Sequence, residues 1–430
     1  MRIFAVVLVL SAPVAHAATW DNEAGVYALP PLPSATAEAL RLDTTQREDQ
    51  QPLGRTVRTG DQVTIGLPDL PAGVGASLIV GFRPMWGHSV DQQIERLGPG
   101  ETQITATQDG PLFLRLTGAG PEIAVRLTGG DSIPLYVDGA MTAADWQVEL
   151  DTHKGAGFVQ LVGDRALITL PSDVYQRAPI PEPAASFAMI NRVLALEDDL
   201  SGLDGADPLD APSPLRQHFL VDFRASAEDR QNFYMYATDG YIGLLPDNSS
   251  DLTNPDLLQV SWGPWHEIGH IEQPYSWTWG SLTEININIW SLYVEESLGN
   301  PSRLAETDAA GKTTLARARD YLGAGGGVPD YLIDDSDTLF IRLVMFHQLR
   351  VVYSWDLFRT LNQQVRRDLL PRDAPDQDKV DLFVRLVCTI TGHDLRGFFD
   401  RWGLRATAPV LAEIGQLNLP LPPIDPAREF

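Results

Sequence analysis

The chain has 430 residues, and its 57 Asp and Glu residues outnumber its 32 Lys and Arg residues, which gives a formal net charge of -25 at pH 7. So acidic a chain repels phosphate backbones and anionic lipid headgroups, and we expect neither nucleic acid nor a membrane surface as a partner. The single cysteine, Cys388, excludes an intramolecular disulfide, so the hydrophobic core alone must hold the fold.

Residues 1–17 have the pattern of a signal peptide. Arg2 precedes an apolar stretch from Ile3 to Leu10, and the small-residue sequence Ala15-His16-Ala17 ends the segment. The apolar stretch is too short to span a bilayer, and no later stretch approaches the roughly 20 residues that a membrane helix needs. We therefore expect export to the periplasm or the extracellular space without membrane insertion. An apolar first strand is the alternative.

Residues 18–140 are predicted to form a β-sandwich domain. Short segments rich in β-branched and aromatic residues are separated by turns that contain Gly and Pro, with strands expected at 62–65, 76–82, 103–106, 112–116 and 123–127. Near residue 141 this pattern changes, and the first domain is expected to end there.

Residues 141–410 are predicted to form a second, mainly helical domain, so that the fold class is multidomain with α and β parts. Strands are expected at 157–161, 166–170 and 218–223, and a long helix begins after Pro183. Later helices are predicted at 302–322, 337–356, 379–387 and 394–403. Residues 411–430 are expected to form a Pro-rich C-terminal tail.

The sequence His266-Glu267-Ile268-Gly269-His270 carries the clearest chemical signal in the chain. On a helix its two imidazoles share one face and can bind a single metal ion. Glu267 then lies beside the ion, where its carboxylate can accept a proton from a water molecule that the metal activates. The motif predicts a zinc hydrolase with Glu267 as the general base.

A catalytic zinc site usually has a third protein ligand, and Glu284 is the candidate. Pro274 ends the first helix and a second segment begins near Ser281, so Glu284 can return to the metal. Glu284 also fits a capping box with Ser281, in which its side chain would only bind a backbone amide. Residues 285–289 fit both an alternating strand and an amphipathic helix, and both interpretations stay open.

Residues expected to contact the substrate lie on both sides of this motif. Trp277 and Trp279, between the two metal-binding segments, can stack on a sugar or a side chain; packing that holds the connector is the alternative. The fold implied by the family resemblance described below predicts that the segment 234–243 forms the edge of the cleft, with Tyr241 and Gly243 as substrate-binding residues.

No donor for the developing oxyanion is assigned from the sequence. Three tyrosines are candidates, and a place in the core is the alternative for each of them: Tyr241, Tyr293 and Tyr353.

The segments 261–273 and 284–293 resemble the enhancin-like zinc metallopeptidases, which are gluzincins. The segment 234–243 and two later stretches, 339–358 and 395–403, extend this likeness over roughly residues 150–405. The resemblance implies an N-terminal β-sandwich followed by a mainly helical zincin catalytic domain.

By position, the resemblance also implies that His266, His270 and Glu284 bind one Zn2+ per chain and that Glu267 is the general base. It implies a secreted endopeptidase whose substrates are proteins, and in bacteria often O-glycosylated, mucin-like proteins. The sequence departs from many relatives at 234–236, where they have a Met-His pair. A monomer is expected.

Two other functions remain as alternatives. The chain can be a non-catalytic adhesin that binds glycans or proteins and retains a zincin fold, although such a protein has no need for Glu267. It can also be a zinc hydrolase that acts on a non-peptide amide or ester.

Overall fold

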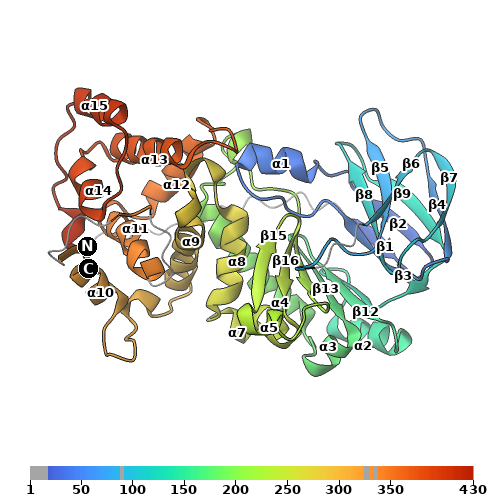
Figure 1. Ribbon diagram of the computed structural model, residues 1–430. Coiled ribbons are helices and arrows are strands. Elements are labelled where there is room, and N and C mark those ends of the chain that lie inside the picture. Colours follow the sequence, from blue (N-terminus) through green and yellow to red (C-terminus); the bar gives the residue numbers. More distant parts are fainter. Residues whose placement is uncertain (1–17, 88–91, 324–329, 333–337, 430) are drawn as a thin grey trace, which may run out of the picture. The chain divides into compact units, whose positions relative to one another are not determined.

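The computed structural model describes residues 18–87, 92–323, 330–332 and 338–429. The predicted signal peptide, residues 1–17, lies outside these residues. The chain divides into two compact units (Figure 1). Unit 1 contains Met1–Leu32, Gln50–Arg83 and Asp91–Ser132, and unit 2 contains Pro33–Asp49, Pro84–Val90 and Ile133–Phe430.

In the described residues, unit 1 contains two five-stranded antiparallel sheets, with strand orders β1-β2-β9-β4-β7 and β10-β3-β8-β5-β6. Alternation along β9 is clear: Ile123, Val125 and Leu127 are buried, and the residues between them are exposed. Buried side chains from both sheets form one hydrophobic cluster, as the period of two predicts. The strands are β1 (Thr19–Asp21), β2 (Val26–Leu29), β3 (Gln51–Val57), β4 (Gln62–Leu67), β5 (Gly75–Val80), β6 (Gln93–Leu97), β7 (Gly100–Thr105), β8 (Gly110–Thr117), β9 (Ile123–Thr128) and β10 (Asp131–Ser132).

Unit 2 is built around a six-stranded mixed sheet of order β11-β12-β13-β14-β16-β15, counted within the described ranges. Every residue of β13 and β14 is buried, including the polar Thr169, Gln217 and His218, so neither strand shows the alternation of a half-exposed strand. Strand β15 lies at the edge of the sheet and pairs with β16 alone. The strands are β11 (Leu135–Val137), β12 (Phe158–Val162), β13 (Ala166–Pro171), β14 (Gln217–Val221), β15 (Met235–Thr238) and β16 (Tyr241–Leu244).

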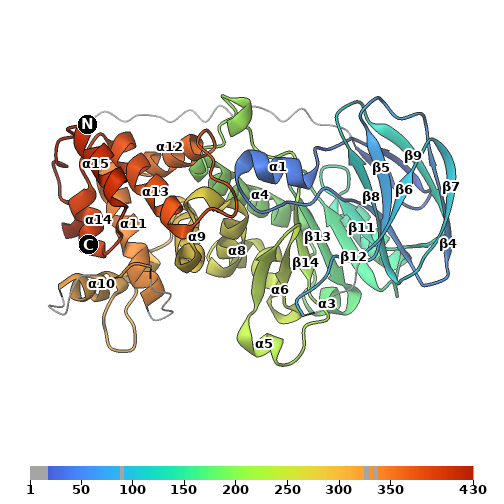
Figure 2. The same ribbon diagram turned by 45° about the horizontal axis from the view of Figure 1, so that its top comes forward.

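Helices make up most of the rest of unit 2. In Figures 1 and 2, α11, α13, α14 and α15 gather at one end of the unit, and α8 lies beside β15. Helix α4 packs against both α8 and α9. The longer helices are α1 (Ala35–Leu42), α2 (Ala143–Thr152), α4 (Pro183–Leu200), α8 (Trp262–Glu272), α9 (Thr283–Ser297), α10 (Thr314–Gly323), α11 (Leu339–Tyr353), α12 (Asp356–Val365), α13 (Asp376–Thr391) and α15 (Ala408–Gln416); the shorter ones are α3 (Ser172–Arg177), α5 (Asp229–Asn232), α6 (Ser249–Thr253), α7 (Pro255–Leu258) and α14 (Arg396–Trp402).

The units differ in detail from the predicted domains. Unit 1 ends at Ser132 rather than near 140, because β11 already pairs with β12 in the sheet of unit 2. The segment 33–49, between two strands of unit 1, also belongs to unit 2. Near the C-terminus, α15 runs across residue 411, where the Pro-rich tail was expected to begin. Pro409 lies in the first turn of that helix, where proline is tolerated.

Other sequence predictions agree closely with the structure. The helix expected after Pro183 is α4, and Cys388 is buried and free on α13. The helix expected at 302–322 is shorter, since only Thr314–Gly323 is α-helical. None of the helices within the described ranges is long and apolar enough to cross a membrane.

A buried ion pair fastens the segment 33–49 to the core of unit 2. The guanidinium of Arg47 forms ion pairs with Glu272, the last residue of α8, and with Asp198 on α4. Glu272 also accepts a hydrogen bond from Ser201 Oγ (3.1 Å). All three charged side chains are at most 6% exposed, so their charges are balanced by one another rather than by water.

Replacing Arg47 is therefore expected to destabilise unit 2 strongly. Arg47→Ala leaves Glu272 and Asp198 buried without this cation, which should lower the free energy of unfolding by about 3–5 kcal/mol. Arg177→Ala is the matched control, because the pair of Arg177 with Asp173 is 54% and 69% exposed. Loss of this exposed pair should lower the free energy of unfolding by less than about 1 kcal/mol. Urea unfolding followed by tryptophan fluorescence measures both, and equal losses would contradict the assignment.

Candidate active site

Helix α8 presents His266 and His270 on one face. Trp265, Ile268 and Ile271 are each 1% exposed and pack into the hydrophobic core of unit 2, which turns the opposite face of the helix outward. His266 and His270 are four residues apart on that outward face, with side chains 21% and 16% exposed. The sequence therefore places both imidazoles at the surface of a cleft, on a helix whose position the core fixes.

Helix α9 approaches α8 closely because residue 269 is a glycine. A Cβ atom at Gly269 would lie 2.9 Å from the carbonyl oxygen of Ile287, closer than carbon and oxygen atoms pack. Without a side chain there, the backbones of the two helices can meet. This contact brings Glu284, in the first turn of α9, over the two histidines.

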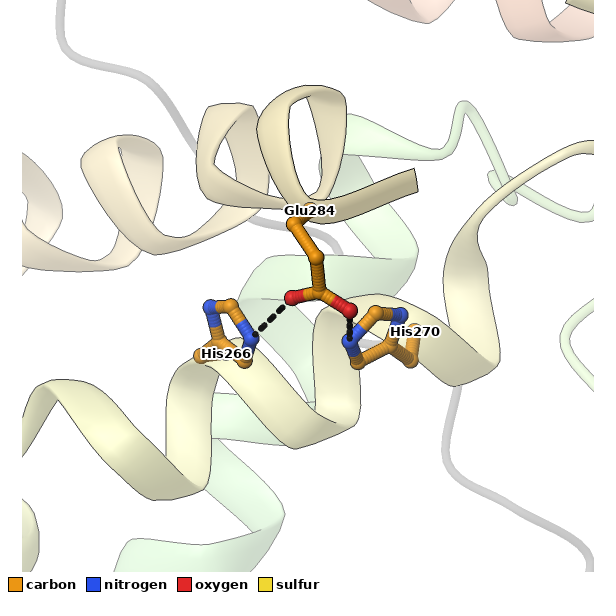
Figure 3. A group of neighbouring side chains, drawn as sticks. All are labelled: His266, His270 and Glu284. Atoms are coloured by element: carbon orange, nitrogen blue, oxygen red, sulfur yellow. Dashed lines mark ion pairs between the residues drawn. The ribbon is translucent and has the colours of Figure 1, made fainter. Parts of the chain in front are cut away.

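The carboxylate of Glu284 lies between the two imidazoles (Figure 3). Its Oε2 is 3.2 Å from His266 Nε2 and its Oε1 is 3.6 Å from His270 Nε2. The two rings hold the pKa of the Glu284 carboxyl well below its usual range by hydrogen bonding to its charged form.

The competing interpretations of this segment do not hold in the structure. Residues 285–289 are helical, as part of α9. The N-cap of α9 is Leu282, which makes no side-chain cap, and Ser281 Oγ has no hydrogen-bond partner in the described part of the chain. Glu284 is thus free of the capping box and points to the histidines instead.

These three side chains fit a zinc ion. One ligand atom from each of them lies within 4.8 Å of the other two. Zinc bonds to imidazole nitrogen and carboxylate oxygen are about 2.0–2.2 Å long, so tetrahedral ligand atoms should be about 3.3–3.6 Å apart. The distances between Glu284 and the histidines, 3.2 Å and 3.6 Å, are close to this range. Two imidazoles and one carboxylate also form a common donor set of catalytic zinc.

Asn288 orients His266 and was not identified from the sequence. Its Oδ1 lies 2.9 Å from His266 Nδ1 and also accepts a hydrogen bond from Trp262 Nε1 (3.1 Å). Its Nδ2 donates to the carbonyl oxygen of Glu284 (2.9 Å). Because an amide oxygen only accepts, Nδ1 of His266 carries the proton and Nε2 presents its lone pair to the metal position. The signal in the sequence is the spacing of four residues from Glu284.

Glu267 lies on α8 beside the metal position and is only 8% exposed. Burial raises the pKa of its carboxyl, although the neighbouring His266 and His270 act in the opposite direction. The backbone N–H of Ala237 on the edge strand β15 also lowers this pKa. A partly desolvated carboxylate with a raised pKa is a stronger proton acceptor than one in water.

A cleft of about 960 Å³ opens over these residues. Strand β15 forms one wall, as the sequence predicted for the segment 234–243, and α8 and the start of α9 form the floor. The lining includes Thr45, Trp86, Asn232, Phe233, Tyr234, Met235, Tyr236, Ala237, Thr238, Asp239, Gln273, Tyr275, Thr278, Gly280, Thr283, Arg372, Asp376 and Lys379, together with the four motif residues.

The structure does not bring the four predicted substrate-binding residues to this cleft. Trp277 and Trp279 are fully buried, and Trp277 Nε1 donates to Asn362 Oδ1 (3.2 Å). Tyr241 is 2% exposed and donates to the carbonyl oxygen of Pro84 (2.6 Å). Gly243 lies on β16, one strand in from the edge of the sheet, and the ring of Tyr236 from β15 covers it. Packing of the connector, the alternative given for the tryptophans, agrees with their positions.

Comparison with known proteins identifies the family of this chain. The family model described as peptidase M60, enhancin and enhancin-like, matches residues 129–403, which is more than half of the chain. The chain belongs to this family. The M60 match confirms the predicted resemblance to enhancin-like metallopeptidases, and it covers both α8 and α9.

Relatives of this M60 chain include proteins with other names. The TRPM8 channel-associated factor homolog of Xenopus laevis is 24% identical over 286 residues, which is 65% of this chain and 29% of that protein. The chain thus spans less than a third of this curated relative.

Solved structures with the same fold cover nearly the whole chain. A functionally unknown conserved protein from Bacillus anthracis str. Ames is 25% identical, with a TM-score of 0.81 over 94% of this chain and 80% of that one. A metallopeptidase in complex with Tn antigen is 18% identical, with a TM-score of 0.79 over 95% of this chain and 80% of that one. The predicted order, a β-rich N-terminal part followed by a helical part, is confirmed.

If Glu284 is the third ligand in this M60 chain, its removal should abolish tight zinc binding. We expect Glu284→Ala to lose most of its zinc on dialysis, because two imidazoles alone leave the ion with an incomplete set of protein ligands. Glu296→Ala, on the same helix but paired with Arg350, is the matched control and should retain zinc. Atomic absorption measures both, and equal zinc contents would contradict the ligand role.

Removal of the Asn288 amide should weaken zinc binding without removing a ligand. Asn288→Leu leaves His266 Nδ1–H without its acceptor, and we expect roughly a 10- to 100-fold loss of zinc affinity. Asn288→Asp keeps the acceptor for His266 Nδ1–H but loses the donor to the Glu284 carbonyl, so it should retain more of the affinity than Asn288→Leu. Competition with a chelator of known zinc affinity measures both variants. An unchanged affinity in Asn288→Leu would show that the hydrogen bond does not orient the ligand.

Proposed function

We propose that the protein is an exported, zinc-dependent endopeptidase that hydrolyses peptide bonds in proteins, and in O-glycosylated, mucin-like proteins in particular. The observation that carries this proposal is the convergence of His266, His270 and Glu284 at the floor of an open cleft, with the buried carboxylate of Glu267 beside them. Family membership supports the same reaction class.

Each residue has a defined task in this mechanism. His266, His270 and Glu284 hold the ion. When bound, zinc supplies a Lewis acid that polarises the scissile carbonyl and lowers the pKa of water. Glu267 accepts the proton of the attacking water and then gives it to the leaving amine, which restores the carboxylate.

The edge strand supports a polypeptide substrate. Strand β15 pairs with β16 on one side, and its other side faces the cleft. An extended peptide can add to such an edge through main-chain hydrogen bonds, largely independent of its side chains. A cleft of about 960 Å³ has room for several residues of such a chain. The substrate that fits this arrangement best is an extended, accessible segment of a protein.

Support for a glycosylated substrate comes from the fold neighbours. One of these metallopeptidases was solved with Tn antigen, a protein-linked sugar, and the two chains share their fold over 95% of this one. We therefore include O-glycoproteins in the proposed substrate class.

A binding function is the second candidate, because curated relatives carry the name of channel-associated factors. Those proteins are more than three times as long as the matched part. In this chain the complete ligand set and the buried base favour catalysis, since a binding protein gains nothing from a desolvated Glu267.

One experiment separates these functions. Zinc-loaded protein, with and without chelator, is incubated with casein, a mucin and the same mucin after deglycosylation. We expect cleavage that the chelator abolishes and that Glu267→Gln lowers by roughly 10²- to 10⁴-fold with unchanged zinc content. Glu296→Gln, an exposed carboxylate away from the metal, should cleave normally. Products are identified by mass spectrometry.

The substrates then decide the finer points. Equal cleavage of glycosylated and bare mucin would overturn the preference for O-glycoproteins and leave the peptidase intact. Cleavage of none of these substrates by zinc-loaded protein would favour the binding function.

A further inference from the structure

The wall of the cleft contains a tyrosine hydroxyl that no other group uses. Tyr234 directly precedes β15, lines the cleft and is 45% exposed. Within the described residues its hydroxyl makes no hydrogen bond. Its backbone is held in place, since its carbonyl oxygen accepts from the N–H of Leu245 (2.9 Å). The side chain is thus presented from a fixed point of the sheet with its donor available.

Gly263 fixes where this hydroxyl lies. A Cβ atom at Gly263 would be 2.3 Å from Tyr234 Oη, so the end of the tyrosine ring occupies the space that a side chain would fill. Residues 263 and 267 are four apart on α8, on one face of the helix, with Cβ positions about 5–6 Å from each other. The hydroxyl therefore lies over the helical turn that leads to Glu267.

This close approach also explains a glycine that the backbone does not need. Gly263 is the second residue of α8, and its φ is not in the positive region that favours glycine. Glycine is a poorer helix former than alanine. The space that Gly263 leaves for Tyr234 is its structural role.

Other tyrosines near the cleft have their hydroxyls occupied. Tyr236 Oη donates to Asp222 Oδ2 (2.7 Å), and Tyr241 Oη donates to the carbonyl oxygen of Pro84 (2.6 Å). Tyr275 Oη lies 3.4 Å from Thr45 Oγ1. Tyr293, a candidate from the sequence, bonds to Asp199 and Arg359. Tyr234 is the tyrosine of the cleft wall whose donor is left for a substrate.

The electrostatic surroundings keep this donor protonated. Burial raises the pKa of the Tyr234 hydroxyl, and the neighbouring Glu267 carboxylate raises it further. At neutral pH the group therefore remains a neutral hydrogen-bond donor.

We propose that Tyr234 is a catalytic residue, whose hydroxyl donates a hydrogen bond to the carbonyl oxygen of the scissile peptide as that oxygen gains negative charge. The assignment rests on the proposed endopeptidase function. No bond of the tyrosine breaks: the proton of the attacking water passes to Glu267 and then to the leaving amine, while Tyr234 stabilises the oxygen from the side. Such a donor acts mainly in the transition state.

The first test compares Tyr234→Phe with Tyr353→Phe, a matched loss of a hydroxyl on α11, where the ring packs against His393. Tyr234→Phe should lower kcat by roughly 10²- to 10³-fold and leave KM within about twofold, because the donor is used in the transition state. Its zinc content and melting temperature should be unchanged. Tyr353→Phe should match wild type. A wild-type kcat in zinc-loaded Tyr234→Phe would overturn the assignment.

Gly263→Ala gives an independent test that a purely structural role cannot imitate. Alanine favours the helix, so the melting temperature should hold or rise, but its Cβ takes the place of the hydroxyl and kcat should fall as in Tyr234→Phe. Adding Tyr234→Phe to Gly263→Ala should then have little further effect. Additive losses would show that the two changes act separately and would overturn the geometric argument.

A binding measurement separates failure of this proposal from failure of the proposed function. The probe is a tetra-alanine peptide whose central amide is replaced by a phosphinic group, PO2-CH2, which mimics the charged tetrahedral carbon. Calorimetry should show Kd weakened by roughly the same factor as kcat in Tyr234→Phe. An equal Kd overturns the role of Tyr234. If the Kd depends on Tyr234 but no protein substrate is cleaved, the endopeptidase function is overturned. The hydrogen bond from Tyr234 to the bound phosphinic group would then still stand.

Discussion

The close approach of α8 and α9 is the constraint on which the site depends. It exists because Gly269 has no side chain to hold the carbonyl of Ile287 away. One turn of α9 then brings Glu284 to the two histidines, where the proposed metal site lies, and the next brings Asn288 to His266. The connector is tied at its base as well, since Gln273 Nε2 donates to the carbonyl oxygen of Thr283 (2.8 Å). Ligand geometry here is a consequence of helix packing.

The rest of unit 2 holds that packing in place from two sides. From inside, Trp277 stacks on Trp290 and Phe383, with ring centroids 6.3 Å and 5.5 Å away, so the connector is anchored in the hydrophobic core. From the other side, Asp43 accepts hydrogen bonds from the N–H groups of Tyr275 and Ser276, both 2.8 Å long. The aromatic residues of the connector thus fix the backbone that carries Glu284, the proposed third ligand.

These contacts explain which features could be predicted from the sequence. The pair His266 and His270 follows from helical spacing alone, whereas the cleft edge at 234–243 was expected from the family resemblance, and residues 234–239 of that segment line the cleft. The sequence did not distinguish the helix at 283–297 from a strand. Ile285 through Glu295 are all buried, and a helix buried all round shows no single apolar face. The burial of Trp277 and Trp279 could not be predicted for a different reason: it depends on Phe346 of α11 and Phe383 of α13, which follow much later in the chain. The partners of Arg47 are equally distant in sequence.

The charge of the cleft likewise depends on the residues that line it and cannot be read from the net charge of the whole chain. The formal charge of -25 belongs to the whole chain, and at physiological ionic strength its field is screened beyond about 8 Å. Within the cleft the nearest groups decide, and these include Arg372 and Lys379. Arg372 lies 4.3 Å from the ring centre of Tyr275 and donates to the carbonyl oxygen of Thr44, and Lys379 Nζ donates to that of Thr278 (3.0 Å). Both cations are therefore held at the connector, so an acidic chain can still present a mixed-charge wall to its substrate.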